Sequence, residues 1–170
     1  MSLHTLSVLV QNRPGVLTRC AGLFARRGFN IDSLAVGPTE DESRSRITIR
    51  VDCSQSSVDQ VIKQLYKLVD VLKVNELGPT AVELELLMIK VASTPERRPE
   101  IIALAEVFDS RVVDVGPEAI TFSCMARPDR LHALEELLRP YGIKELVRTG
   151  RIALDRDGGQ TRRQRMRVVA

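Results

Sequence analysis

Polar and glycine residues near the N-terminus are the groups of this chain best suited to binding a small ligand. Asn12 ends an apolar segment, Pro14 and Gly15 follow it, and Asn30 opens the next apolar segment. Each asparagine side chain offers a carbonyl and an amide, so it can bind an ammonium or a carboxylate group. Because the first amides of a helix have no acceptor within it, a helix starting at Pro14-Gly15 adds further donors. Together these groups can hold a zwitterion such as an amino acid.

The start of this expected helix favours an anion. The amides of Gly15, Val16 and Leu17 lack intrahelical acceptors, and with the helix dipole they attract a carboxylate. Gly15 has no side chain to block a ligand from the backbone, and Pro14 suits a first helical turn. In the alternative interpretation, Pro14-Gly15 only starts a helix and Asn30 only starts a strand. Spacing alone leaves both interpretations open.

No pattern in the sequence indicates catalysis. The two histidines, His4 and His132, lack the Cys, Ser or Asp partners that are typical of a triad. Thr39–Ser43 gathers acidic and hydroxyl residues, for which a solvated loop is the alternative to a metal site. The three cysteines are isolated and odd in number, which predicts neither a disulfide framework nor a metal centre. A reduced, cytoplasmic setting fits this use of cysteine.

The basic charge of the chain lies in its C-terminal segment. From Arg156 on there are five arginines and one aspartate, a net charge of +4, whereas the whole chain is +3, so the preceding residues sum to −1. No apolar run approaches the roughly 18 residues of a membrane span. The N-terminus also lacks the basic and apolar pattern of a secretory signal. The sequence therefore predicts neither a nucleic-acid partner nor a membrane partner.

The elements that position the candidate ligand-binding residues follow a strand–helix–strand–strand–helix–strand order. Apolar periodicity predicts, in turn, a strand Leu3–Val10, a helix between Pro14 and Gly28, strands Ile31–Val36 and Arg46–Cys53, a helix after the capping pattern at Ser56–Asp59, and a strand Val71–Leu77. Gly78-Pro79 then breaks the chain. This βαββαβ order is the ferredoxin-like split unit.

The second half of the chain repeats that order. The expected elements are a strand Val82–Ala92, a helix around Ile101–Phe108, strands Val112–Val115 and Ile120–Met125, a helix around Leu131–Leu138, and a strand Ile143–Leu154. We therefore predict an α+β protein with two ferredoxin-like βαββαβ domains, residues 1–78 and 79–155. A basic tail, residues 156–170, is expected to be mobile.

An uncovered sheet edge in such a domain predicts a homodimer. Pairing of two copies covers the edge, and its symmetric seam brings two copies of the Gly15–Asn30 region together. RNA-recognition modules share the βαββαβ topology, but they carry aromatic residues on their central strands for base stacking. Leu3–Val10 and Arg46–Cys53 contain no aromatic residue, so an RNA-binding module is the weaker alternative.

The segment Leu6–Val36 closely resembles the start of the small regulatory subunits of acetohydroxyacid synthase, also called acetolactate synthase. The matching motifs are Leu6–Val10, Asn12–Leu17 and Gly22–Val36, with further similar stretches at Gln64–Val71 and Glu83–Val91. Many amino-acid-sensing ACT domains share the motif Asn-x-x-Gly-Val-Leu. Far fewer continue through Arg-Gly-Phe-Asn-Ile-Asp-Ser-Leu, and the resemblance covers nearly the whole chain.

The resemblance implies that the first domain is an ACT domain and that two such domains pair into a dimer. It also implies that a feedback inhibitor, typically valine, binds between them, although leucine or isoleucine can take its place. The positions that hold this effector in the family are Asn12, Gly15 and Asn30, with Val16, Leu17 and Ile31 as neighbours.

The resemblance further implies a partner, a large catalytic subunit that uses thiamine diphosphate, magnesium and FAD. This chain would carry none of these cofactors and no catalytic residue. It would raise the activity of the partner in branched-chain amino-acid biosynthesis and confer feedback inhibition. The alternative is a free-standing ACT-domain sensor that regulates another protein.

Overall fold

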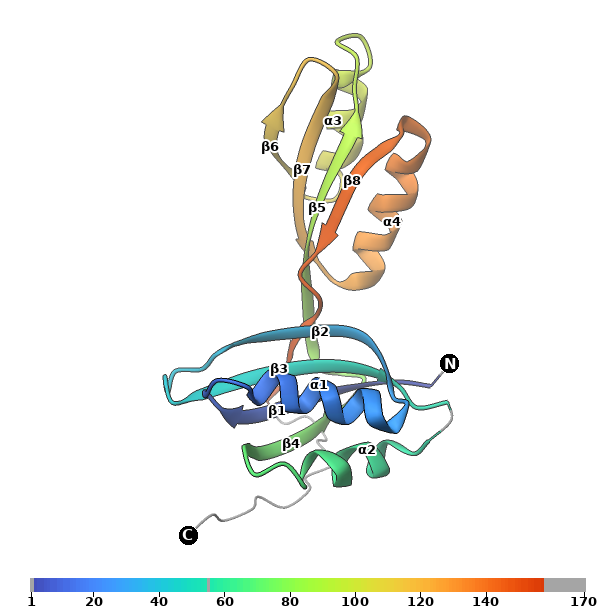
Figure 1. Ribbon diagram of the computed structural model, residues 1–170. Coiled ribbons are helices and arrows are strands. Elements are labelled where there is room, and N and C mark those ends of the chain that lie inside the picture. Colours follow the sequence, from blue (N-terminus) through green and yellow to red (C-terminus); the bar gives the residue numbers. More distant parts are fainter. Residues whose placement is uncertain (1, 55, 158–170) are drawn as a thin grey trace. The chain divides into compact units, whose positions relative to one another are not determined.

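The computed structural model describes residues 2–54 and 56–157, which form two compact units (Figure 1). The first unit extends to Val82 and takes in the described residues from Arg151 on. The second unit is Glu83–Gly150. Each unit combines an antiparallel sheet with two α-helices, so the predicted α+β fold class is confirmed.

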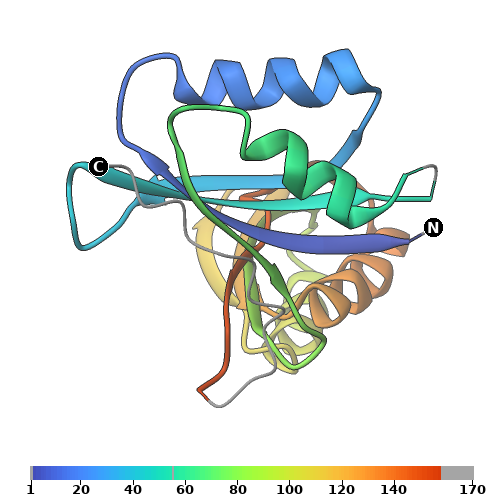
Figure 2. The same ribbon diagram turned by 90° about the horizontal axis from the view of Figure 1, so that it is seen from below.

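The first unit has the predicted βαββαβ order. Its elements are β1 (Leu3–Gln11), α1 (Val16–Arg27), β2 (Asn30–Pro38), β3 (Arg44–Asp52), α2 (Val58–Leu65) and β4 (Val71–Leu77). The four strands lie in the order β2-β3-β1-β4, so β2 and β4 form the edges of the sheet. Every neighbouring pair is antiparallel. Figure 2 shows α1 and α2 on the same face of this sheet.

Local sequence signals explain where the two helices of the first unit begin and end. The buried face of α1 is made by Val16, Cys20, Leu23 and Phe24, which recur at helical spacing. Gly28 ends α1 with a φ of 68°, and its amide donates to the carbonyl of Ala25. At the start of α2, the Ser57 hydroxyl accepts a hydrogen bond from the Gln60 amide, so Ser57 rather than Ser56 is the cap.

The second unit repeats the arrangement of the first. Its elements are β5 (Val82–Ala92), α3 (Arg98–Glu106), β6 (Arg111–Val115), β7 (Ala119–Ala126), α4 (Pro128–Leu138), a 3₁₀ turn η1 (Arg139–Tyr141) and β8 (Ile143–Arg148). The strand order is β6-β7-β5-β8, equivalent to that of the first unit. A short strand β9 (Ile152–Leu154) also pairs with β5.

The strand predicted over Ile143–Leu154 is interrupted. β8 ends at Arg148, and Gly150 adopts a φ of 80°, a left-handed conformation that an extended strand does not contain. The chain resumes as β9. A continuous strand was therefore a wrong prediction, because the apolar residues on either side of the glycine belong to two separate strands.

The residues after this break return to the first unit. The amide of Arg151 donates to the hydroxyl of Ser33 on β2 over 2.9 Å, and Ala153 packs against Leu77 and Ala81 in a small apolar cluster. The observed division thus falls after Val82 and again after Gly150, whereas the sequence suggested domains of residues 1–78 and 79–155. Of the basic tail predicted from residue 156 on, all but the first two residues lie outside the described part of the chain.

Candidate functional site

Gly15 caps the start of α1 in a left-handed conformation. Its φ is 82° and its ψ is −4°, and the helix proper begins at Val16. Pro14 therefore lies in the turn before the helix, and its predicted place in the first helical turn was wrong. Residues with a side chain are strained at this φ, so the backbone requires glycine here independently of any ligand.

The first helical turn leaves fewer free amides than the sequence suggested. The Val16 amide donates to the carbonyl of Arg13 over 3.3 Å, and the Arg19 amide donates to the carbonyl of Gly15 over 2.9 Å. The Leu17 amide belongs to the first turn, where the helix supplies no acceptor. The Val16 side chain is buried in the core, whereas Gly15 and Leu17 are exposed. Gly15 and Leu17 are thus the accessible part of the predicted anion site.

Asn12 is held beside the loop that joins β2 to β3. Its backbone amide donates to the carbonyl of Ser43 over 2.7 Å, and its side-chain amide donates to the carbonyl of Glu42 over 2.9 Å. These bonds leave the side-chain carbonyl as the group that can accept from a ligand ammonium. Asn12 and Gly15 therefore lie in one connected turn at the same end of the sheet.

The acidic loop next to Asn12 is closed by its own hydrogen bonds. The Asp41 carboxylate accepts from the amide and the hydroxyl of Ser43, and these bonds lower the pKa of Asp41. Among residues 2–54 and 56–157, no three His, Cys, Asp or Glu side chains gather in a group that could hold a metal ion. The loop Thr39–Ser43 therefore forms a turn that is closed by its own hydrogen bonds.

Asn30 lies at the far end of α1 from this turn. It pairs with Asp52, the last residue of β3, whereas Gln11 at the end of β1 pairs with Arg44, the first residue of β3. The 12 residues of α1 span about 18 Å at the usual rise per residue. Figure 2 shows α1 running along the sheet between these two ends. Within one chain, Asn12 therefore lies beside the start of α1, whereas Asn30 lies at the opposite end of the helix.

The edge of the sheet next to α1 exposes apolar surface. β2 is an outer strand of the sheet, so one side of its backbone has no neighbouring strand in the described chain. Val36 on β2 is 50% exposed and Leu17 on α1 is 40% exposed. Ile31 packs partly against the core. Unpaired strand edges bordered by apolar side chains favour pairing with another chain.

Next to the helix start, the half-exposed Arg19 forms an ion pair with the buried Asp70 that no pattern in the sequence predicts. The Nε and Nη2 atoms of Arg19 each lie 2.8 Å from Oδ2 of Asp70, whose side chain is only 9% exposed. The Asp70 carbonyl also accepts from the Gln11 amide over 2.9 Å. Asp70 lies within Gln64–Val71, a stretch that resembles the family, and this resemblance could have drawn attention to it. Nothing in the sequence indicates that Asp70 pairs with Arg19.

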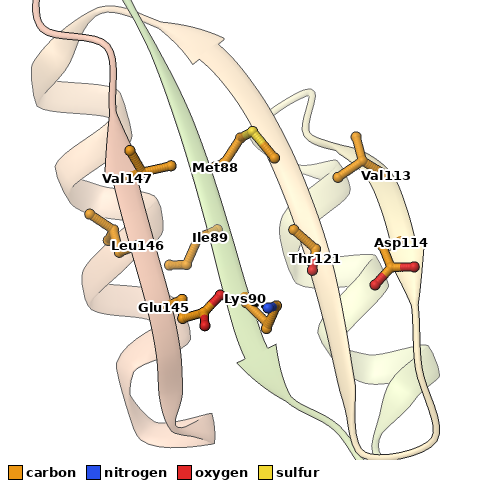
Figure 3. Close-up of a pocket in the computed structure, with 9 residues that line it drawn as sticks. All are labelled: Met88, Ile89, Lys90, Val113, Asp114, Thr121, Glu145, Leu146 and Val147. Atoms are coloured by element: carbon orange, nitrogen blue, oxygen red, sulfur yellow. Dashed lines mark hydrogen bonds and ion pairs between the residues drawn. The ribbon is translucent and has the colours of Figure 1, made fainter.

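An open hollow of about 460 Å³ lies on the second unit. It is lined by Met88, Ile89, Lys90, Val113, Asp114, Thr121, Glu145, Leu146 and Val147 (Figure 3). Lys90 and Glu145 form an ion pair of 2.6 Å that raises the pKa of Lys90 and lowers the pKa of Glu145. A general acid or base needs a pKa near the working pH, and this pair moves both groups away from neutrality. The Lys90–Glu145 pair is therefore not suited to general acid–base catalysis.

The three cysteines are also unsuited to chemistry. Cys20, Cys53 and Cys124 are buried and unpaired. Burial raises the pKa of Cys20 and that of Cys53, so both remain neutral thiols rather than nucleophilic thiolates. Within the part of the chain that the structure covers, no helix is long and apolar enough to cross a membrane.

Comparison with known proteins identifies the family of both units. Residues 6–73 match the model of the AHAS small subunit-like ACT domain, and residues 84–157 match the model of the small subunit of acetolactate synthase. The two matches together cover most of the chain. The ACT fold predicted for the first unit is thereby confirmed.

Individual relatives match this chain over more than nine tenths of their own lengths. The acetolactate synthase small subunit of Mycolicibacterium smegmatis is 46% identical over 154 residues, which is 90% of this chain and 91% of that protein. The small subunit of Mycobacterium bovis is 45% identical over 90% of this chain and 92% of its own length. The crystal structure of the small subunit from Thermotoga maritima superposes with a TM-score of 0.85 at 38% identity, covering 92% of this chain and 98% of that one.

Proposed function

The chain belongs to the family of acetolactate synthase small subunits, and we propose that it activates a catalytic large subunit and makes it sensitive to valine. The observation that carries this proposal is an ACT domain whose Asn12–Gly15 turn presents a side-chain carbonyl and helix-start amides together. Such a pair of groups is complementary to the ammonium and the carboxylate of an amino acid.

Two chains are needed to complete the effector site that we propose. A two-fold axis beside β2 runs the two β2 strands antiparallel, so the Asn30 end of one strand lies next to the Pro38 end of the other. The Pro38 end adjoins the loop that holds Asn12. Side-by-side pairing thus places Asn30 of one copy near the helix start of the other. The same pairing covers Leu17 and Val36, which are exposed in a single chain.

Effector binding at this seam favours the dimer arrangement that suits it. A ligand shifts an equilibrium only by its difference in affinity for the two states. Allosteric couplings are commonly about 1–3 kcal/mol, which changes an activity several-fold to a hundredfold. Feedback inhibition in this proposal is the large subunit's response to that shift.

The chemistry itself is assigned to the large subunit. Thiamine diphosphate, magnesium and FAD would all be held there, and this chain would hold none of them. The ion pairs Arg19–Asp70 and Lys90–Glu145 and the turn closed by Asp41 are structural arrangements, which suits a regulatory role. The prediction of a cytoplasmic setting belongs to the same proposal.

The test is acetolactate formation by the cognate large subunit, with and without this chain, across a valine titration. The proposal expects activation by the chain, and it expects valine to reverse that activation. Activation without a response to valine would support the large subunit as the partner, and leucine and isoleucine would then be tested as effectors. If the chain left the large subunit unchanged, a free-standing amino-acid sensor would be the better description.

A further inference from the structure

The guanidinium of Arg19 lies directly against the helix start that carries the proposed effector site. A Cβ atom placed on Gly15 would meet the Nη1 atom of Arg19 at 3.0 Å, so the absence of a side chain at Gly15 brings backbone and guanidinium together. Long side chains in helices point toward the N-terminus, which is why a residue four positions later reaches this point. Arg19 thus adds a positive charge to a place where the helix dipole already favours an anion.

Asp70 fixes the orientation of this guanidinium. The Asp70 carboxylate contacts only one edge of the Arg19 guanidinium, because Nε and Nη2 each lie 2.8 Å from the same oxygen, Oδ2. Asp70 is itself buried and anchored through its carbonyl to the Gln11 amide, so it is a fixed support. A charged side chain held in this way loses little freedom when a ligand binds.

The remaining edge of the guanidinium keeps its donors. A guanidinium has five N–H groups, and Asp70 occupies one on Nε and one on Nη2. Within residues 2–54 and 56–157, Nη1 has no hydrogen-bond partner. The edge formed by Nη1 and the second N–H of Nη2 has the geometry that binds a carboxylate through two parallel hydrogen bonds.

We propose that Arg19, positioned by Asp70, binds the carboxylate of the amino-acid effector and makes the site selective for a free carboxylate. This inference rests on the proposed function, because it adds a residue to the same effector site. Helix amides attract an anion in general, whereas the fork of Arg19 requires two coplanar oxygens. The site therefore discriminates an amino acid from its amide or its amine.

The experiment compares valine with valine amide on the full-length chain by calorimetry. Valine amide keeps the ammonium and the side chain but replaces the carboxylate with a neutral group. The variants are Arg19→Gln, Arg19→Lys and Asp70→Asn. Arg130→Gln is the matched control, because Arg130 pairs with Asp109 over 2.9 Å and is 48% exposed, as Arg19 is.

Arg19→Gln is expected to weaken valine binding about tenfold or more and to reduce the preference for valine over valine amide by a similar factor, since a charged hydrogen bond is lost. Arg19→Lys recovers part of the affinity because it restores the charge without the fork. Asp70→Asn loosens the guanidinium and moves the preference in the same direction, whereas Arg130→Gln leaves affinity and preference unchanged.

Valine binding by the parent chain separates a failure of the Arg19 inference from a failure of the proposed function. If the parent binds valine and Arg19→Gln binds it with the same affinity and the same preference, the inference is overturned and the proposed function stands. An equal loss of affinity for both ligands would also overturn it, because that pattern indicates a general disturbance of the site. If the parent itself binds no valine, the proposed function fails before Arg19 is tested.

Discussion

Two variants that are each defective in a different half of the effector site are expected to restore valine binding when they are combined in one dimer. Gly15→Asp places a carboxylate at the helix start, where it repels the carboxylate of the effector. Asn30→Ala removes the polar side chain at the other end of α1. The φ of 82° at Gly15 strains any residue with a side chain, but aspartate enters the left-handed region more readily than most.

The expected magnitude follows from the separation of the two positions. A span of about 18 Å along α1 is longer than a single amino acid, so no effector touches Gly15 and Asn30 of one chain. With an antiparallel seam, each site takes Gly15 from one copy and Asn30 from the other. A dimer of the two variants then has one site with both changes and one site with neither. Random exchange makes mixed dimers about half of the total, so about a quarter of all sites are intact.

The assay is calorimetric counting of valine sites on the two variants, separately and after exchange. Different affinity tags on the two variants allow the mixed dimer to be isolated, in which about half of the sites bind. The control is an exchange between two differently tagged preparations of Gly15→Asp, which gains no sites. Isolated mixed dimers that bind no valine, beside a parent that does, would refute the shared site.

Two further predictions concern the first unit alone. Gly28→Ala is expected to lower the free energy of unfolding, measured by urea titration, by about 1–2 kcal/mol. The cause is the φ of 68°, since no atom lies within 4 Å of the added Cβ. An NMR titration should place the pKa of Asp41 below its ordinary 3.8, and Ser43→Ala should raise it. Because the folded-state pKa is the lower one, this loop's contribution to stability is present above the unfolded-state pKa and is lost as the pH falls through the folded-state pKa.

Periodicity and turn residues predicted the fold well because each element carries its own local signal. The alternation of Ile47, Ile49 and Val51 specifies a strand with one buried face, and all three are buried. Gly28 ends α1 as expected. The error at the last strand had a local cause as well, since Gly150 was treated as part of an apolar run instead of a break.

The candidate site was less predictable because it depends on contacts between distant residues. Spacing suggested that Asn12 and Asn30 flank one ligand, but the helix between them sets them at opposite ends of the sheet. The pairing of Arg19 with Asp70 joins residues 51 positions apart, which no helical or strand period reports. The left-handed cap at Gly15 is likewise invisible in a sequence where Pro14 suggests a helical first turn.

The proposed division of the effector site between two chains would couple inhibition to dimer assembly. If the effector contacts exist only in the dimer, valine stabilises the dimer, and dimerisation raises the apparent affinity for valine by the same factor. Two equal sites related by a two-fold axis also share their seam, so the first effector to bind orders contacts that the second one uses. In the proposed dimer, the separation of Asn12 and Asn30 by the length of α1 would therefore make effector binding depend on the arrangement of the two chains. Had one chain held both residues together, binding would have been a local event with no necessary effect on the seam.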